Sequence, residues 1–362
     1  MTEIPSVSPP LGDDQQRLTR ALEMFWHPVC TLEELTKPSL GSHDGARPLP
    51  VRLLGRDLAI ADVPDHGVIA LDDRCLHRST KLSVGWVDSA GVRCAYHGWL
   101  WDGSGKCIDI PALPDGPIPS RARVGAYSTQ IAYGLVWVRI DDRAGTSIPA
   151  CPAFDDPGLR VLTGDPYTWP TAAPRRVENF VDLAHFAWVH AGTLGRRDEP
   201  VPPLPELSRV DGELRFTYDP PEFDPASTAM YGSSRYRMPM PCTVSIEFTL
   251  DTGARRLLWM TASPIDAVSC RSFWFIARDD DLDGDDEPHF AFQRIVLEED
   301  EPVVTNQVPA WFPLDTTTEI SVRTDKVSIE YRRWMREIAD AADPARLAAL
   351  VGRASPLTLS PG

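Results

Sequence analysis

Two short motifs, each pairing a cysteine with a histidine, constrain the fold of this 362-residue chain more than any other feature. His77 follows Cys75 by two residues, and His97 follows Cys94 by three, with sixteen residues between His77 and Cys94. Strand-like runs flank both motifs, and glycines at positions 85, 91 and 98 allow sharp turns. The sequence therefore predicts two loop tips that each present one thiolate and one imidazole.

These four side chains can hold a 2Fe-2S cluster in which cysteines bind one iron atom and neutral histidines bind the other. The alternative is a zinc site with two cysteines and two histidines. Zinc modules, however, pair cysteine with cysteine and histidine with histidine, whereas each motif here contains one of each. We therefore interpret the motifs as ligands of a cluster that accepts electrons and passes them on.

A second group of polar residues interrupts an apolar segment, residues 174–190, that is predicted to be helical. Asp182 and His185 are three residues apart and would share a helical face. His185 and His190 are five residues apart and would point about 140° away from each other on a regular α-helix. Both histidines can reach one metal ion only if the helix widens into a π turn or ends between them.

Two imidazoles and a carboxylate form the facial triad that leaves open positions on Fe(II) for oxygen. Burying the polar residues of this segment without partners would cost several kcal/mol. Hydrogen-bonded core histidines are the alternative, and it is the weaker one for the whole set because the set matches this triad. We therefore predict a mononuclear Fe(II) site at His185 and His190.

Both groups resemble signature segments of the Rieske-type non-heme iron oxygenases that hydroxylate aromatic rings or remove O-methyl groups. CLHR at Cys75 and CAYHGW at Cys94 are similar to the Rieske signature, and ENFVDLAHFAWVH, residues 178–190, is similar to the mononuclear-iron motif. Ser79 departs from the family, which commonly has glycine there, and this affects the expected loop geometry but not ligation. The resemblance extends over roughly residues 20–340.

The resemblance implies roles for further residues. Asp182 would bridge from the iron site toward a Rieske histidine, and Asn179 would support the iron ligands. The family's helix carries a Glu-Asp pair followed by apolar residues, and by this likeness Asp300 is the third iron ligand. The other acids of the run 298–301 fit a solvated charge run.

The distribution of strand-like and helical patterns predicts an α+β chain. Strand-like runs include residues 58–63, 68–71 and 131–140 in the first part and 214–218, 243–250, 256–262 and 272–277 in the second; helices are expected at 14–26 and 326–341. The resemblance implies an all-β Rieske domain followed by a helix-grip catalytic domain, an antiparallel sheet around a long helix. The predicted parts are an N-terminal segment (1–24), the Rieske domain (25–140), a linker (141–160), the catalytic domain (161–345) and a C-terminal tail (346–362).

Composition limits the possible partners. The net charge is −16, from 36 basic and 52 acidic residues, without a basic cluster that would bind nucleic acid. We expect no membrane span and no secretion signal, hence a cytoplasmic protein, and seven cysteines in such a chain argue against disulfides. No glycine-rich dinucleotide fingerprint is present, so a separate reductase or ferredoxin would deliver electrons from NAD(P)H.

We therefore predict an oxygenase that uses O₂ to hydroxylate or oxidatively demethylate an aromatic or polycyclic small molecule. Apolar residues after His190 and on the strands between Tyr236 and Phe275 are expected to line its pocket. Ring cis-dihydroxylation and a purely electron-transferring Rieske protein are the alternatives. The resemblance, in particular to the stand-alone monooxygenase branch, implies a head-to-tail homotrimer in which the cluster of one chain faces the iron of the next.

Overall fold

The computed structural model describes residues 12–37, 46–219, 233–250, 252–315, 317–341 and 343–351. The chain forms two compact units. The N-terminal unit comprises Glu23–Pro149 together with Ser263–Asp266, and the C-terminal unit comprises Met1–Leu22, Ala150–Ala262 and Ala267–Gly362. Helices and antiparallel sheets occur together, which confirms the predicted α+β class.

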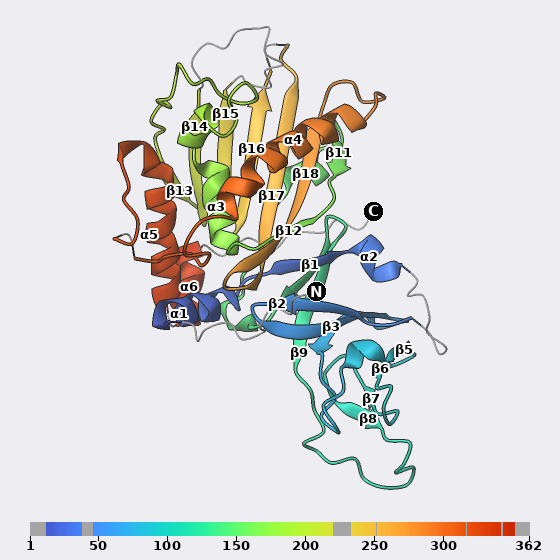
Figure 1. The fold of residues 1–362 in the computed structure, drawn as a ribbon. Coiled ribbons are helices and arrows are strands. Elements are labelled where there is room, and N and C mark those ends of the chain that lie inside the picture. The colour runs from blue at the N-terminus through green and yellow to red at the C-terminus, as the bar shows by residue number, and fades with distance from the viewer. Residues whose placement is uncertain are drawn as a thin grey trace, which may run out of the picture. The chain divides into compact units, whose positions relative to one another are not determined.

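Two antiparallel sheets make up the N-terminal unit (Figure 1). The six-stranded sheet has the order β1-β10-β9-β4-β3-β2, and the smaller sheet has the order β5-β6-β7-β8. The strands are β1 (His27–Thr31), β2 (Leu49–Leu53), β3 (Arg56–Val63), β4 (Gly67–Asp72), β5 (Trp86–Asp88), β6 (Gly91–Arg93), β7 (Leu100–Trp101), β8 (Cys107–Asp109), β9 (Ala126–Ala132) and β10 (Leu135–Arg139), and the helices are α2 (Leu32–Thr36), η1 (Leu82–Val84) and η2 (Asp142–Ala144).

One predicted strand is two strands. The run 131–140 contains the end of β9 and all of β10, which are joined at Tyr133 and Gly134. Both turn residues have positive φ, 58° and 70°, and Leu135 pairs with Ala132, as in a two-residue hairpin whose twist matches the flanking strands. The continuous apolar pattern concealed the turn because the non-glycine residue of the pair is an aromatic one.

An antiparallel sheet forms the centre of the C-terminal unit, with the order β11-β18-β17-β16-β15-β14-β13 and β12 paired to β18. The strands are β11 (Arg160–Thr163), β12 (Tyr167–Trp169), β13 (Ser208–Val210), β14 (Glu213–Tyr218), β15 (Ser234–Pro239), β16 (Thr243–Thr249), β17 (Arg255–Asp266) and β18 (Ser269–Arg278). The helices are α1 (Asp13–Leu22), η3 (Pro152–Phe154), α3 (Ala173–Val181), η4 (Ala184–Ala187), α4 (Glu287–Val304), η5 (Arg323–Asp325), α5 (Lys326–Asp340) and α6 (Pro344–Val351).

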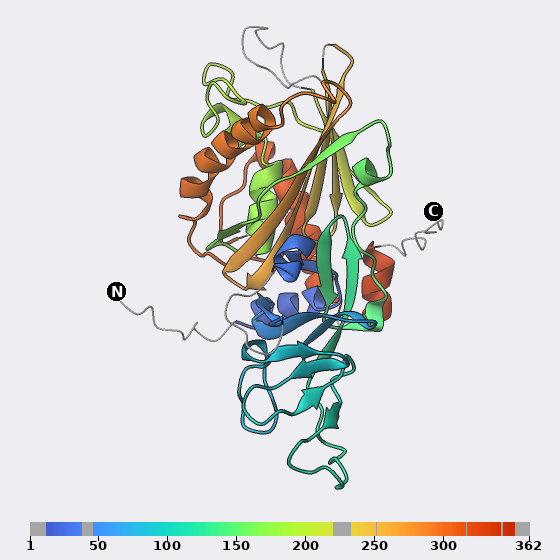
Figure 2. The same cartoon turned by 90° about the vertical axis from the view of Figure 1, so that its right-hand side faces the viewer.

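The long helix α4 lies against one face of this sheet, with α3 beside it (Figures 1 and 2). This is the sheet-and-long-helix arrangement that was predicted, and α5 occupies the predicted terminal helix. Gln15 of α1 donates from its side chain to the carbonyl of Phe312 at 2.8 Å, which attaches the N-terminal helix to the same unit. The cleft between α4 and the sheet strands contains the candidate iron site.

Candidate metal centres and substrate cavity

The two cysteine loops of the N-terminal unit share one backbone geometry. In each loop the cysteine N–H, of Cys75 or Cys94, donates to the carbonyl five residues later, and the N–H four residues later donates back to the cysteine carbonyl. All four bonds measure 2.8 to 3.0 Å. The residue at the fourth position is left-handed in both loops, with φ 60° at Ser79 and 73° at Gly98. The two loops therefore present their side chains from matching turns.

Ser79 keeps this geometry although it is not glycine. Its hydroxyl oxygen accepts hydrogen bonds from Nε and Nη2 of Arg74, at 3.2 and 3.0 Å. The left-handed region costs a non-glycine residue roughly 1 kcal/mol, so the arginine contact supports a conformation that glycine would adopt without it. The departure seen in the sequence is thus compatible with the family's loop shape.

The four predicted cluster ligands lie together. Both cysteines are buried, and their thiols are close enough that a hydrogen bond from Cys75 lowers the pKa of Cys94 to about 6. The rings of His77 and His97 are 4.4 Å apart, and the buried Nδ1 of His77 has no hydrogen-bond partner among the described residues. Two thiols, one of them easily ionised, and an unpartnered imidazole nitrogen fit a 2Fe-2S cluster.

Two tryptophans pack beside these loops. The Trp99 ring stacks on His77 with 4.6 Å between ring centroids and 9° between the planes. Trp101 is completely buried, 5.9 Å from Trp99. Their rings thus cover the His77 side of the candidate cluster ligands.

The iron motif of the C-terminal unit leaves the helix earlier than predicted. Helix α3 ends at Val181, and Asp182 is extended, with φ −79° and ψ 105°. His185 then lies in the short 3-10 helix η4, and His190 follows it. The expectation that Asp182 and His185 share a helical face is therefore wrong: the chain turns after α3, which is how two histidines five residues apart come to face one point.

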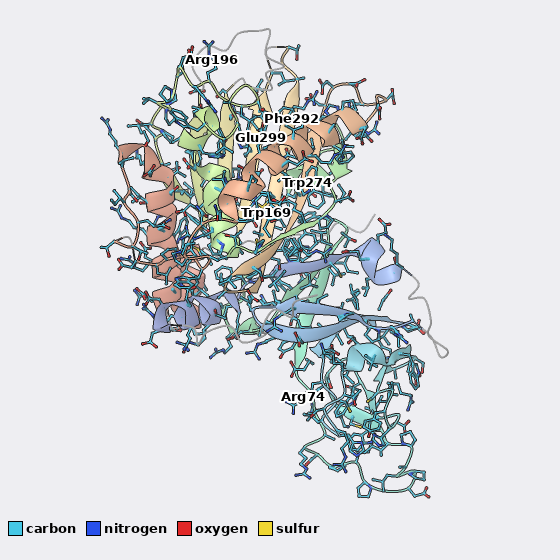
Figure 3. All side chains as sticks on the ribbon, viewed as in Figure 1. Arg74, Trp169, Arg196, Trp274, Phe292 and Glu299 are labelled. Carbon is cyan, nitrogen blue, oxygen red and sulfur yellow. The ribbon has the colours of Figure 1, made fainter. Side chains whose placement is uncertain are left out.

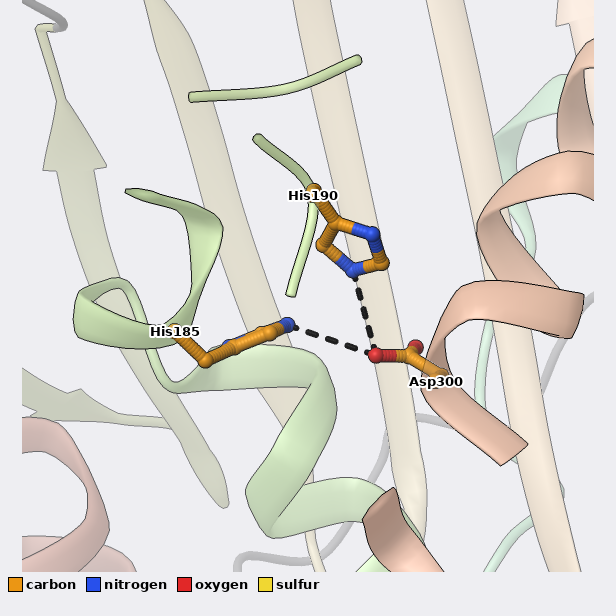
Figure 4. A group of neighbouring side chains, drawn as sticks. All are labelled: His185, His190 and Asp300. Carbon is orange, nitrogen blue, oxygen red and sulfur yellow. Dashed lines mark ion pairs between the residues drawn. The ribbon is translucent and has the colours of Figure 1, made fainter. Parts of the chain in front are cut away.

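His185, His190 and Asp300 converge from the segment after α3 and from α4 (Figure 4). Asp300 Oδ1 lies 3.1 Å from Nε2 of His190 and 3.5 Å from Nε2 of His185. One ligand atom from each residue lies within 4.8 Å of the others, and all three side chains are largely buried. Two imidazole nitrogens and a carboxylate at these separations could hold Fe(II) as a facial triad.

Glu299 has a role that the sequence did not indicate. Its Oε2 lies 2.7 Å from Nδ1 of His190, and its Oε1 accepts a hydrogen bond from the Thr193 hydroxyl at 2.8 Å. The interpretation of Glu299 as a solvated acid is wrong, because from its position on α4 (Figure 3) its carboxylate bonds to the His190 ring and the Thr193 hydroxyl. A glutamate beside the third ligand was the available signal, since metal-bound histidines usually donate their other N–H to a carboxylate or carbonyl.

Asp300 is also held from behind by α3. Asn179 donates from Nδ2 to Oδ1 of Asp300 at 3.2 Å, and Nη1 of Arg176 lies 3.7 Å from Oδ2. Burial acts to raise the pKa of Asp300, but hydrogen bonds from the two histidines and the charge of Arg176 outweigh it, so the pKa lies well below its usual value. The carboxylate is therefore ionised and ready to bind a cation.

Arg176 is completely buried, which is costly for a cation without partners. Its Nε donates to the Tyr167 hydroxyl at 2.8 Å, and Nη1 donates to the side-chain oxygen of Asn179. The guanidinium also lies over the rings of Trp169 and Phe180, 4.7 and 4.9 Å from their centroids. These contacts fix a positive charge directly behind the candidate ligand carboxylate.

Asp182 lies between the iron site and solvent. Its backbone carbonyl is 2.5 Å from Nδ1 of His185, and its carboxylate accepts a hydrogen bond from the N–H of Ala184 at 2.9 Å. The nearest carboxylate oxygen is 3.9 Å from the same Nδ1, and the side chain keeps 36% exposure. Within this chain the backbone of Asp182, rather than its carboxylate, orients His185.

The glutamate that opens the iron motif is structural. Glu178 is buried and accepts hydrogen bonds from Nε and Nη2 of Arg332, a residue of α5. The same guanidinium donates to Glu319 at 2.5 Å. This ion-pair network joins α3, which carries Asn179, to α5.

A cavity of about 400 Å³ opens beside the three candidate ligands. The predicted strands contribute to it through Tyr236, Ile246 and Leu258, and Leu194 follows the histidines as expected. The sequence did not indicate that one face of α4 would form the opposite wall. That wall consists of Pro288, His289, Phe292, Gln293, Val296 and Asp300.

Each of the two units matches a known domain family. The Rieske [2Fe-2S] domain matches residues 25–127, and the vanillate O-demethylase oxygenase C-terminal domain matches residues 169–341. The chain belongs to the Rieske non-heme iron oxygenases. The enzyme therefore carries a Rieske cluster and a mononuclear iron, and it incorporates oxygen from O₂ with electrons from a reductase or ferredoxin. An electron carrier without oxygenase activity is excluded by the oxygenase domain.

Two curated relatives align over most of their length. The methylxanthine N3-demethylase NdmB of Pseudomonas putida is 43% identical over 90% of this chain and 92% of its own, and the methylxanthine N1-demethylase NdmA of that species is 41% identical over 88% and 90%. The solved structure of NdmA with caffeine superposes with a TM-score of 0.85 at 38% identity, covering 92% of this chain and 96% of NdmA. Dicamba monooxygenase shares the fold at 21% identity and a TM-score of 0.73.

No helix in the described parts of the chain is sufficiently long and apolar to cross a bilayer. The cytoplasmic location stays a prediction from the sequence.

Proposed function

We propose that Cys75, His77, Cys94 and His97 bind the Rieske cluster and that His185, His190 and Asp300 bind the iron. When bound, the two groups supply electrons and activate O₂ at the iron. Glu299 supports this assignment because its carboxylate accepts a hydrogen bond from the Nδ1–H of His190, which leaves Nε2, the nitrogen facing Asp300, as the atom that would bind a metal. The Asp182 carbonyl acts in the same way on His185. Both imidazoles are thereby oriented with Nε2 toward Asp300, and a bound metal would replace the Nε2 protons that hydrogen-bond to this carboxylate here.

The reaction that we propose is oxidative N-demethylation of a flat, N-methylated heteroaromatic compound. One oxygen atom of O₂ enters a C–H bond of the N-methyl group, and the N-hydroxymethyl product then loses formaldehyde, leaving N–H. The second oxygen atom leaves as water, with two electrons from NAD(P)H and two protons balancing the reaction. The chain's own residues must therefore hold the methyl group at the triad and exclude bulk water.

The cavity is the observation that carries this proposal. Its walls are largely apolar and include the rings of Phe180, Phe186 and Phe292, which suit a flat aromatic compound. Gln293 of α4 is buried, faces the cavity and makes no side-chain hydrogen bond with the described residues. Its amide offers both a donor and an acceptor to ring heteroatoms. Two methylxanthine N-demethylases align over nearly the whole chain, and this similarity supports an N-methyl rather than an O-methyl group as the substrate group.

Caffeine and theobromine are suitable probes of this proposal. With a supplied reductase and ¹⁸O₂, we expect NADH consumption, a demethylated xanthine and labelled formaldehyde, which must be trapped before it exchanges oxygen with water. A cis-diol as the product would instead assign ring dihydroxylation. Absence of formaldehyde from these and related N-methylated heteroaromatics would contradict N-demethylation.

We also propose that the enzyme is a head-to-tail homotrimer in which electrons cross between chains. The Asp182 carboxylate would connect the iron site of its own chain to His97 of the partner subunit. Its partial exposure and the exposed ring of His97 support this role, since a charge-assisted hydrogen bond needs both groups to be accessible. A heterologous contact of this kind closes into a ring.

Mixed trimers test this electron path. A Cys94→Ala chain lacks the cluster, a His185→Ala chain lacks the iron, and each homotrimer is expected to be inactive. Co-assembled rings place an intact cluster beside an intact iron in adjacent chains, so activity should return. Inactive mixed trimers of verified composition would favour transfer within one chain.

A further inference from the structure

The cavity has a polar end far from the iron ligands. His289, Gln293, Val296 and Asp300 follow one another at intervals of four, three and four residues, so they lie along one face of α4. With a rise of 1.5 Å per residue, Gln293 stands about 10 Å and His289 about 16 Å along the helix from Asp300. The wall facing the sheet therefore carries two polar positions at different depths.

The sheet contributes a row of residues that reaches the same end. Tyr218 pairs with Ser234, Ser234 with Phe248, and Phe248 with Arg256, and all four side chains line the cavity. Arg256 contacts the start of α4, because its Nη1 lies 2.9 Å from Nδ1 of His289. The row therefore runs across the sheet wall from Tyr218, near Phe186, to Arg256, which meets His289.

The contact with Arg256 determines which nitrogen of His289 carries the proton. A guanidinium has only donors, so Nδ1 must accept its hydrogen bond and the proton must be on Nε2. The Nε2 group makes no hydrogen bond with the described part of the chain. Burial, together with the charges of Arg256 and Arg278, lowers the pKa of His289 and keeps the ring neutral. His289 thus offers one uncommitted N–H donor at the wall of an apolar cavity.

The surrounding loop is rigidly held. Residues 279–286 form bends and turns that lead into α4. Arg278, completely buried, donates to the carbonyl of Asp280 at 2.8 Å, and Arg160 donates to the Asp286 carboxylate at 2.5 Å. The donor at His289 is therefore positioned before any ligand binds.

Charge at this end is balanced. The Asp280 carboxylate accepts a hydrogen bond from Nη2 of Arg256 at 2.9 Å, which neutralises the guanidinium. A carboxylate on the substrate would have to be desolvated here without a free counter-charge, which is costly. An uncharged acceptor meets no such cost. The buried Nε of Arg256 and Oδ1 of Asp280 lack hydrogen-bond partners among the described residues, so this ion pair is not fully hydrogen-bonded.

We propose that His289, held by Arg256, is a distal recognition residue that donates a hydrogen bond from Nε2 to an uncharged acceptor on the substrate, such as a carbonyl oxygen. This inference rests on the proposed N-demethylation and extends it. A fused two-ring compound beside the triad reaches the level of Gln293. An acceptor at His289 therefore belongs to a substituent beyond the rings, so the physiological substrate is longer than a methylxanthine.

A matched pair of probes tests the donor. One is caffeine carrying a 3-oxobutyl group at C8, which is remote from N1 and N3; the other carries 3-methylbut-3-enyl, in which CH₂ replaces the carbonyl oxygen. Calorimetric titration of the iron-loaded enzyme should show roughly fivefold to tenfold tighter binding of the ketone, the effect of one additional neutral hydrogen bond. His289→Leu should abolish this preference, and His289→Gln, which keeps a donor amide, should retain most of it.

Glu287→Gln is the control variant, because Glu287 is exposed at the same end of α4 and lies outside the cavity wall. It should preserve the preference, and all variants should keep the visible cluster spectrum and the melting temperature. Equal binding of the two probes by the wild-type enzyme, or an unchanged preference in His289→Leu, overturns the proposal.

A crystal soak separates this proposal from the proposed reaction. If caffeine yields no formaldehyde and neither xanthine probe binds, N-demethylation of such compounds fails, but the distal donor can still be tested with N-methylacetamide alone. Its carbonyl oxygen should lie within hydrogen-bond distance of Nε2 of His289 in the soaked holoenzyme. Density for the amide elsewhere in the cavity, with none at His289, contradicts the distal site.

Discussion

The two candidate metal centres are built in opposite ways. The cluster ligands come from two loops close together in the sequence, and each loop fixes its own shape through hydrogen bonds between residues four and five positions apart. The iron ligands come from segments 110 or more residues apart, since His190 and Asp300 meet only when α3 and α4 pack on the sheet. A local site depends on loop geometry, whereas a dispersed site depends on the whole unit.

The largest expected effect is the complete loss of one metal centre, with the other retained, when a ligand is replaced. Cys94→Ala should bleach the red-brown cluster and leave about one iron per chain, while His185→Ala should keep the cluster spectrum and about two irons, because the ligand sets share no residue. Both variants should lose multiple turnover. Iron analysis and visible spectroscopy measure the metal content of both variants. Loss of the cluster spectrum in His185→Ala would show that the two centres are not independent.

Loss of the ion pair between α3 and α5 should weaken the iron site, which depends on the packing of the whole unit, more than the cluster site. Arg332→Met leaves the buried Glu178 without its partner, so the free energy of unfolding should fall by about 3 kcal/mol. Denaturant unfolding followed by tryptophan fluorescence measures the loss, and iron content should fall before the cluster spectrum changes.

Arg333→Met is the matched control, because the neighbouring Arg333 is exposed and bonds only weakly to Glu330, at 3.4 Å. Its unfolding free energy should change by less than about 0.5 kcal/mol. Equal decreases in unfolding free energy in the two variants would show that the buried ion pair does not stabilise the unit more than an exposed one.

Glu299→Gln should lower the affinity for Fe(II) roughly tenfold to one hundredfold, because a neutral amide makes His190 a less basic ligand. Competition with a chelator measures the affinity, and the cluster spectrum should not change. Glu298→Gln, an exposed acid one position earlier, serves as the control. Similar affinities in the two variants would mean that Glu299 does not act on the ligand.

The smallest expected effect concerns loop geometry at the local site. Ser79→Gly removes the left-handed strain and should stabilise the N-terminal unit by about 0.5 kcal/mol, despite losing the contact with Arg74. Ser79→Ala keeps the strain and loses the contact, so it should be slightly destabilising. Loss of cluster absorbance in denaturant measures both, and a less stable glycine variant would show that the arginine contact outweighs the strain.

The same contrast explains what the sequence could predict. Spacing alone was enough to group Cys75, His77, Cys94 and His97, because the ligands of a local site are close together in the sequence. Asp300 required the resemblance to a known family, since no spacing rule joins it to histidines on another segment. Glu299 and the α4 wall were missed because the direction of a helical side chain depends on how the helix packs.

Two predictions were wrong about where a single helix or strand ends. The pattern of residues 174–190 is helical throughout, yet α3 ends at Val181, because the path to a common metal site is decided by tertiary contacts. The turn at Tyr133 and Gly134 was hidden inside an apolar run for a comparable reason: strand pairing, not composition, selected the hairpin. In both cases the type of element was predictable and its limit was not.

Helix α4 carries the candidate ligand Asp300 and the cavity wall on one continuous face, and this restricts how such a gene can diverge. Substitutions at His289, Gln293 or Val296 change the cavity without moving the ligand. An inserted or deleted residue between them and Asp300 would rotate one part of the helix by about 100° relative to the other. Lineages that acquire new substrates are therefore expected to exchange side chains here while the length of this segment stays constant.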